Sequence, residues 1–149
     1  MADFIVDGIH LDASYLKVAL RAKGIGRAVL ITDAVTPAGA APGRYRIGDL
    51  EVDMTPDGRV VLAGTDRLAG SGLRMDRGVE NLMRLAGMPL ADAVRMATTN
   101  AARAGNVPRR ANGLAAGDRA DLVEFRFDPK AQRIEVLATW VSGRKVFSA

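Results

Sequence analysis

The chain has 149 residues, no cysteine and a formal net charge of +4. This length suits one ordinary domain with its own core, and the lack of cysteine excludes a disulfide framework and thiolate chemistry. Basic residues are interspersed with acidic ones and only 5% of residues are aromatic, which argues against nucleic-acid binding. No stretch approaches the ~20 apolar residues of a transmembrane helix, and the first residues lack a signal-peptide pattern, so we expect a soluble cytoplasmic protein.

The N-terminal segment predicts a strand, a helix and a second strand. Phe4-Ile5-Val6 is a short apolar run of the β type. Asp12 can cap a helix over 13–23, and Gly24 suits its end. The predicted inward face of this helix consists of Tyr15, Leu16, Val18, Ala19 and Leu20. The run 27–34 then predicts a strand buried on both faces, and such a crossover makes the two strands parallel.

Three polar residues follow the two predicted strands. Asp7 and His10 come after the first strand, and Asp33 comes at the exit of the second. Barrels of alternating strands and helices place their chemistry at this end of the strands. The alternatives also hold: Asp33 suits a turn or a cap, and a lone histidine is commonly structural.

The middle of the chain predicts an antiparallel excursion. A small-residue loop over 36–43 leads to strands at 45–47, 50–54 and 60–62, with a turn at 55–58. The segment 64–72 contains three glycines and predicts a loop. Its glycines can present N–H groups to an anion, or they can allow two backbones to pack closely.

The last part predicts two helices and then short strands. The helices span about 76–86 and, after Pro89, about 90–102. A polar connector over 108–113 leads to strands at 120–127, 134–139 and 140–147, with turns at 128–130 and 142–145. This pattern predicts a small β-layer beside an α/β unit.

Several motifs, taken in this order, resemble the C-terminal portion of the N-acetylglucosamine-6-phosphate deacetylases, a family of the amidohydrolase superfamily. The motifs are Asp7-Gly8-Ile9-His10, Leu30-Ile31-Thr32-Asp33-Ala34 followed by Pro37-Ala38-Gly39, Leu68-Ala69-Gly70-Ser71 with Leu73 and Met75, Arg95-Met96-Ala97-Thr98, and the closing run from Gly113 to Val123. The closing run is shared by many amidohydrolases, and the others are more specific. Ala101 stands where the family commonly has proline, which we expect to affect only a helix end.

The resemblance implies an α/β fold that is the C-terminal part of a metal-dependent (β/α)8 barrel. It implies the last two strand-helix units with an antiparallel excursion in residues 1–107, and the C-terminal strands of a small β-sandwich in residues 108–149. The strands near Phe4 and Val29 would be the seventh and eighth of the barrel. Two strands cannot close a barrel, and their open edges favour pairing with other strands, so we expect a homo-oligomer.

The resemblance also implies a reaction: hydrolysis of N-acetylglucosamine 6-phosphate to acetate and glucosamine 6-phosphate, in amino-sugar catabolism. Asp33 would act as general base and then general acid. The implied substrate-binding residues are Asp7, Gly8, Ile9, His10, Leu68, Ala69 and Gly70.

The same resemblance implies a divalent metal, zinc or iron(II), but its ligands do not lie in this chain. The family's ligands are a glutamate and two histidines of the upstream barrel, whereas this chain has a single histidine. We therefore expect the chain alone to bind no catalytic metal, and to need the N-terminal half of the barrel as a partner. The alternative is a catalytically inactive fragment that serves as a phosphosugar-binding or assembly module.

Overall fold

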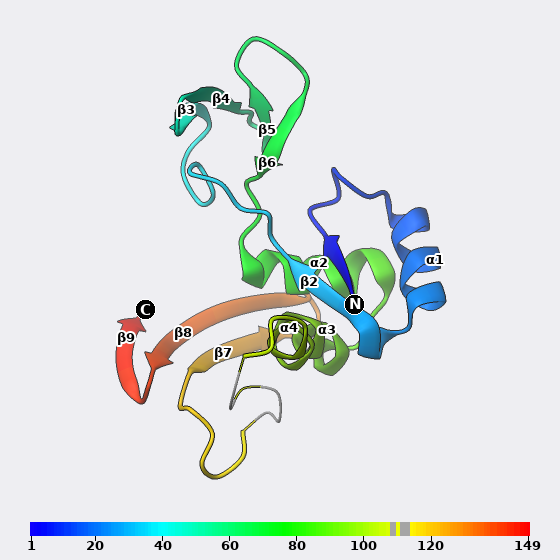
Figure 1. Ribbon diagram of the computed structural model, residues 1–149, viewed down its shortest axis with the longest axis vertical. Helices are drawn as coiled ribbons and strands as arrows, with labels where there is room; N and C mark the ends of the chain where they lie inside the picture. The colour runs from blue at the N-terminus through cyan, green and yellow to red at the C-terminus, as the bar shows by residue number, and fades with distance from the viewer. Residues whose placement is uncertain (108–109, 111–113) are drawn as a thin grey trace.

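The computed structural model describes residues 1–107, 110 and 114–149, which form a mixed α/β fold with three sheets (Figure 1). A parallel pair of strands lies at the centre, and helices pack between it and a three-stranded C-terminal sheet. A four-stranded sheet projects away from this body at the top of Figure 1. Within the described residues the parallel pair is open at both edges and does not form a closed barrel.

The N-terminal unit confirms the predicted strand, helix and strand. Strand β1 (Ala2–Ile5) leads to helix α1 (Ala13–Lys23), a short 3-10 helix η1 (Ile25–Arg27) and strand β2 (Ala28–Ile31). The two strands are parallel, with Ile5 paired to Ile31 at their carboxyl ends. The Asp12 carboxylate caps α1 by accepting from the N–H groups of its first turn.

The predicted inward face of α1 is too broad. Only Leu16 and Leu20 are buried, whereas Tyr15 is 59% exposed and Val18 is 65% exposed. The reason is that α1 packs mainly against α2, which covers one narrow stripe of the helix. Tyr15 and Ala19 border a groove beside β1.

The excursion forms an antiparallel sheet in the order β3 (Gly43–Ile47), β4 (Leu50–Met54), β5 (Arg59–Leu62) and β6 (Leu68–Ser71). The first three strands and the turn at 55–58 confirm the prediction. The segment 64–72 was predicted to be a loop throughout, and this is wrong for its second half, because Leu68–Ser71 pairs with β5 across an irregular register. Alanine and glycine give a weak local strand signal, so the pairing partner decides the structure there.

Three helices follow: α2 (Met75–Ala86), α3 (Leu90–Ala97) and α4 (Thr99–Ala104). The single helix predicted over 90–102 is therefore wrong, because the chain breaks at Thr98 with φ −123° and ψ −90°. The Thr98 hydroxyl donates to the Val94 carbonyl at 2.6 Å, and the new direction takes Asn100 to the base of β2. In the described part of the chain, no helix is long and apolar enough to span a membrane.

The C-terminal sheet has the order β7 (Leu122–Asp128), β8 (Arg133–Val141) and β9 (Arg144–Ser148). Trp140 ends up inside β8 and not in the third strand as predicted. The turn is shorter than the predicted 142–145, since Ser142 and Gly143 both have positive φ and connect the Val141–Arg144 pair directly. In the predicted connector 108–113, residues 108–109 and 111–113 lie outside the described residues, as does Gly113 of the closing motif.

The C-terminal sheet joins the main core through α2. Ile134 of β8 is buried in the same apolar cluster as Phe4, Leu30 and Leu82. The buried Glu80 carboxylate accepts from the Ile134 N–H at 2.7 Å and from Arg77 at 2.6 Å. Helix α2 is thus covered by the parallel pair on one side and by β8 on the other. This packing fixes the position of the carboxyl ends of β1 and β2.

Candidate active site

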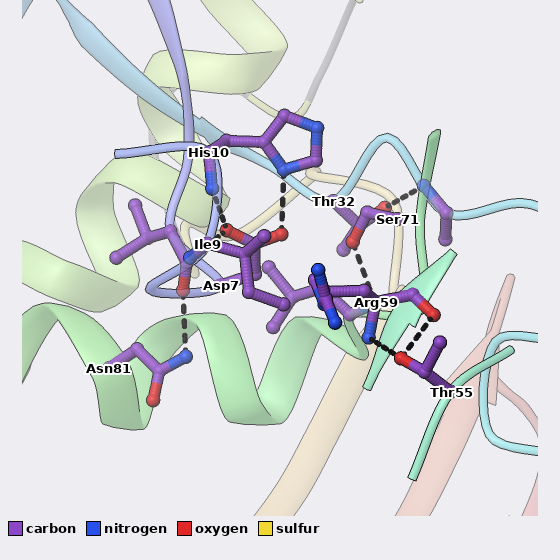
Figure 2. A network of polar contacts seen from close by, with 11 residues as sticks. Asp7, Ile9, His10, Thr32, Thr55, Arg59, Ser71 and Asn81 are labelled. Atoms are coloured by element: carbon purple, nitrogen blue, oxygen red, sulfur yellow. Dashed lines mark hydrogen bonds and ion pairs between the residues drawn. The ribbon is translucent and has the colours of Figure 1, made fainter. Parts of the chain in front are cut away.

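The segment after β1 is organised by one buried carboxylate. Asp7 Oδ1 accepts from the main-chain N–H groups of Ile9 and His10, both at 2.9 Å, and Oδ2 lies 2.7 Å from His10 Nδ1 (Figure 2). The Asp7 side chain is 7% exposed and the His10 side chain 22%. A carboxylate can only accept, so Nδ1 carries a proton and Nε2 remains for another partner. Gly8 provides the positive φ of +80° that this tight exit needs.

Helix α2 anchors the base of the same segment. Asn81 donates from Nδ2 to the Val6 carbonyl at 2.7 Å, and its Oδ1 accepts from Arg84 at 2.7 Å. In Figure 2 Asn81 rises from α2 toward the strand exit. Val6 directly precedes Asp7, so this bond ties the Asp7 segment to the core.

Asp33 lies at the corresponding point after β2. Ile5 and Ile31 are paired, and Asp7 and Asp33 each follow two residues later, so both carboxylates leave the same end of the parallel pair. Asp33 is exposed and has φ +50°, which is uncommon for a residue other than glycine. The Thr32 hydroxyl accepts from the Ala34 N–H at 3.3 Å and so spans this turn.

The predicted Leu68–Gly70 segment lies directly beside Asp33. Ser71 donates its N–H to the Asp33 carbonyl at 2.9 Å, and its own carbonyl accepts from the Val35 N–H at 3.0 Å. Figure 2 shows Ser71 beside Thr32 at this point. A Cβ built on Gly70 would lie 2.5 Å from Val35 Cγ1, so the close-packing explanation of this glycine is supported.

These contacts bring the predicted site residues into two groups. Asp7, Gly8, Ile9 and His10 form one turn after β1, and Asp33 forms the other group with the Leu68–Gly70 segment. Among the described residues no hydrogen bond joins the His10 ring to the Asp33 carboxylate. The arrangement offers a histidine nitrogen and a carboxylate at the same end of a parallel pair, which suits proton transfer and the binding of a polar ligand.

Among the described residues, the groups with a shifted pKa lie away from these strand exits. On the exposed β3–β4 hairpin, the hydrogen bond from Arg44 lowers the pKa of Asp53, and the same bond raises the pKa of Arg44. The Thr55 hydroxyl lowers the pKa of Asp57 in the next turn. The Arg44–Asp53 ion pair and the Thr55–Asp57 hydrogen bond are structural features of the projecting sheet, and they do not mark the site.

The described residues do not fit a metal site. They contain no cluster of three or more histidine, cysteine, aspartate or glutamate side chains suitable for an ion. The single histidine has one ring nitrogen bound to Asp7. No step of the chemistry below therefore passes through a metal held by this chain.

Sequence reasoning missed two buried amides that hold the strand ends. Asn81 anchors the exit of β1, and the fully buried Asn100 donates to the carbonyls of Ile25 and Ala28, both at 2.7 Å, at the entry of β2. Polar residues occur routinely on the exposed face of a helix, so periodicity does not distinguish these two. The signal that could have revealed Asn81 is that other elements cover α2 on both sides, which leaves this helix little exposed surface for a polar residue.

The chain is similar to known amidohydrolases over nearly its whole length. The amidohydrolase family matches residues 4–146. The N-acetylglucosamine-6-phosphate deacetylase of Vibrio furnissii is 35% identical over 147 residues, which are 99% of this chain and 35% of that protein. A protein of Escherichia coli provisionally named N-acetylgalactosamine-6-phosphate deacetylase is 34% identical over 95% of this chain and 80% of its own length.

Two solved structures share the fold. An aspartate-to-alanine variant of the Mycobacterium smegmatis deacetylase, in complex with N-acetyl-D-glucosamine-6-phosphate, gives a TM-score of 0.84 at 37% identity, covering 98% of this chain and 37% of that one. The deacetylase of Thermotoga maritima gives 0.82 at 29% identity, with 99% and 38% covered. This chain thus spans about a third of these solved enzymes. Since the family match covers 4–146, the chain belongs to the amidohydrolase family.

Proposed function

We propose that this chain supplies the catalytic aspartate and the substrate loops of an N-acetylglucosamine-6-phosphate deacetylase. The reaction hydrolyses the N-acetyl group and releases acetate and glucosamine 6-phosphate. The observation that carries the proposal is the position of Asp33, at the carboxyl end of a parallel strand and beside the matching exit that holds Asp7 and His10. The similarity to deacetylases over nearly the whole chain supports the choice of reaction.

Asp33 would move the protons of the reaction. Its carboxylate accepts a proton from the attacking water as the C–O bond forms, and it then delivers that proton to the nitrogen as the C–N bond breaks. Its exposure suits this role, because a substrate can reach it. Its left-handed backbone conformation is of the kind that clusters at functional sites.

The turn after β1 would hold the substrate. The proton on His10 Nδ1 is fixed by Asp7, so the Nε2 atom presents a defined face to a ligand. We assign a contact with the phosphosugar to this histidine, whose Nε2 can accept from a hydroxyl group of the ligand, with Asp7, Gly8 and Ile9 shaping the turn. Leu68, Ala69 and Gly70 would line the sugar beside Asp33.

The rest of the active site would come from another polypeptide segment. We propose that β1 and β2 are two adjacent strands of a (β/α)8 barrel, which is supported by their parallel pairing and their open outer edges. An upstream segment would then complete the barrel and hold the divalent metal, zinc or iron(II). The open edges also favour a homo-oligomer.

The epimeric substrate is a second candidate. The Escherichia coli relative named for N-acetylgalactosamine 6-phosphate is covered over 80% of its length, a larger share than that of the longer deacetylases. The two sugars differ only in the configuration at one hydroxyl, and both carry the same N-acetyl and phosphate groups. Both phosphosugars are therefore candidate substrates and both need to be assayed.

The test is complementation. The chain is mixed with the N-terminal two thirds of the Vibrio furnissii deacetylase and zinc or iron(II), and acetate release from each phosphosugar is measured. We expect metal-dependent turnover that falls about 10²–10⁴-fold in Asp33→Asn, whereas the exposed Asp66→Asn control retains it. Full activity of Asp33→Asn would refute the role of this carboxylate. Phosphosugar binding by the unmixed chain, with no turnover in any mixture, would instead favour a binding module.

A further inference from the structure

The turn that carries Asp33 is held by a segment far away in the sequence. Ser71 brackets the turn with two main-chain hydrogen bonds, one to the Asp33 carbonyl at 2.9 Å and one from the Val35 N–H at 3.0 Å. Ala34 and Ser71 form a parallel bridge between them. Ser71 itself is 2% exposed, and its hydroxyl accepts from the Leu73 N–H at 2.8 Å. This hydrogen bond holds the Ser71 side chain in place.

Gly70 makes this approach possible. Its φ is +81°, and a Cβ at this position would meet Val35 Cγ1 at 2.5 Å and the Asp33 carbonyl oxygen at 3.2 Å. Real Cβ atoms do not come within 2.5 Å of a neighbour, so a side chain here would force the branched Val35 side chain, and with it the tightly packed Asp33–Val35 turn, to shift. Gly64, which lies between β5 and β6, differs: it also has a positive φ, +74°, yet nothing lies within 4 Å of its Cβ position.

We propose that Gly70 and Ser71 are positioning residues for Asp33, which hold its left-handed backbone and so aim its carboxylate for proton transfer. This inference rests on the proposed function, and it gives Gly70 a task beyond contact with the sugar. It also links the projecting β3–β6 sheet to the reacting end of β2. A displacement at the end of β6 would then be transmitted to the acid–base group.

The first experiment examines the geometry in the chain itself. Hydrogen exchange of the Ser71 and Val35 amides and the backbone coupling constant of Asp33 are measured by NMR in the unmodified chain and in variants. We expect both amides to be protected, and Gly70→Ala to accelerate their exchange at least about tenfold and to move Asp33 out of the left-handed region. Gly64→Ala introduces the same kind of backbone strain without the contact, so it should leave all three signals unchanged.

A double variant tests the contact itself. Val35→Ala removes the methyl groups that a Cβ at Gly70 would meet, so Gly70→Ala/Val35→Ala should recover most of the amide protection. If Gly70→Ala does not fold, this variant and the unmodified chain still decide the matter. Exchange of the Ser71 and Val35 amides at the rate of an open loop in the unmodified chain would overturn the proposal.

The kinetic experiment separates positioning from substrate contact. In the complemented enzyme we expect Gly70→Ala to lower kcat about 10–100-fold with little change in KM, and Val35→Ala to restore kcat in the double variant. A raised KM with unchanged kcat would overturn the proposal and make Gly70 a simple substrate contact. The proposed function fails separately, namely if Asp33→Asn keeps full activity.

Discussion

Within the described residues the His10 ring has one hydrogen-bond partner, Asp7, so Asp7→Asn gives a sharp prediction. In the native chain the Asp7 carboxylate accepts from two main-chain N–H groups at 2.9 Å and from His10 Nδ1 at 2.7 Å. An asparagine keeps its Oδ1 for the two main-chain donors and turns its amide nitrogen toward the ring. Two donors then face each other, so the neutral ring must move its proton from Nδ1 to Nε2.

The size of the effect follows from the charge that is lost. A hydrogen bond to a charged group is worth about 1.5–3 kcal/mol and a neutral one about 0.5–1.5 kcal/mol, and the nearly buried Asp7 side chain accepts three, so we expect a loss of about 1.5–3 kcal/mol in unfolding free energy. For a domain of this size that corresponds to a fall in Tm of about 3–12 °C.

The assay needs no assignment, because His10 is the only histidine. Long-range ¹H–¹⁵N NMR distinguishes the protonated from the bare ring nitrogen, in the native chain and in Asp7→Asn. Asp12→Asn is the matched control, because Asp12 is a nearby aspartate that caps α1 and does not contact the ring. A native ring protonated only at Nε2, or an unchanged tautomer in Asp7→Asn, would refute the reasoning.

Three further predictions concern the scaffold. Asn100→Ala removes the two hydrogen bonds to the carbonyls of Ile25 and Ala28 and should cost about 1–3 kcal/mol in chemical denaturation; a loss below about 0.5 kcal/mol would contradict the anchoring role. Leu82→Ala should cost about 2–5 kcal/mol, whereas the exposed Leu50→Ala should cost little, and equal effects would contradict the described core. Arg44 lowers the pKa of Asp53, so this pair stabilises the hairpin above the ordinary aspartate pKa, and its contribution is lost as the pH falls through the lowered value. Hydrogen exchange of β4 should show this acid sensitivity, and Asp53→Asn should lack it.

Local signals predicted the elements whose ends are set by neighbouring residues. Helix α1 begins after Asp12 and ends before Gly24 as expected, because capping and a positive-φ glycine act within one turn. The apolar run before Asp33 likewise predicted a buried parallel strand. The position of Asp33 at its exit could therefore be predicted from the sequence.

Contacts between distant segments could not be predicted in this way. The pairing of Leu68–Ser71 with β5 and the bonds from Ser71 to the Asp33 turn depend on a partner far away in the chain. The same holds for Asn81, which reaches the Val6 carbonyl across 75 residues. The helix break at Thr98 depends on the hydrogen bond that Asn100 donates to the distant Ala28 carbonyl. The exposure of Tyr15 depends on how little of α1 is covered by other elements.

We propose that this chain brings the acid–base aspartate and the substrate loops, while the metal ligands belong to another segment. Acetate release from N-acetylglucosamine 6-phosphate by the purified 149-residue chain with added zinc or iron(II), with bound metal quantified in parallel, tests this division directly. We expect neither bound metal nor turnover until the upstream segment is added. Turnover by the chain alone with one metal ion per chain would contradict it.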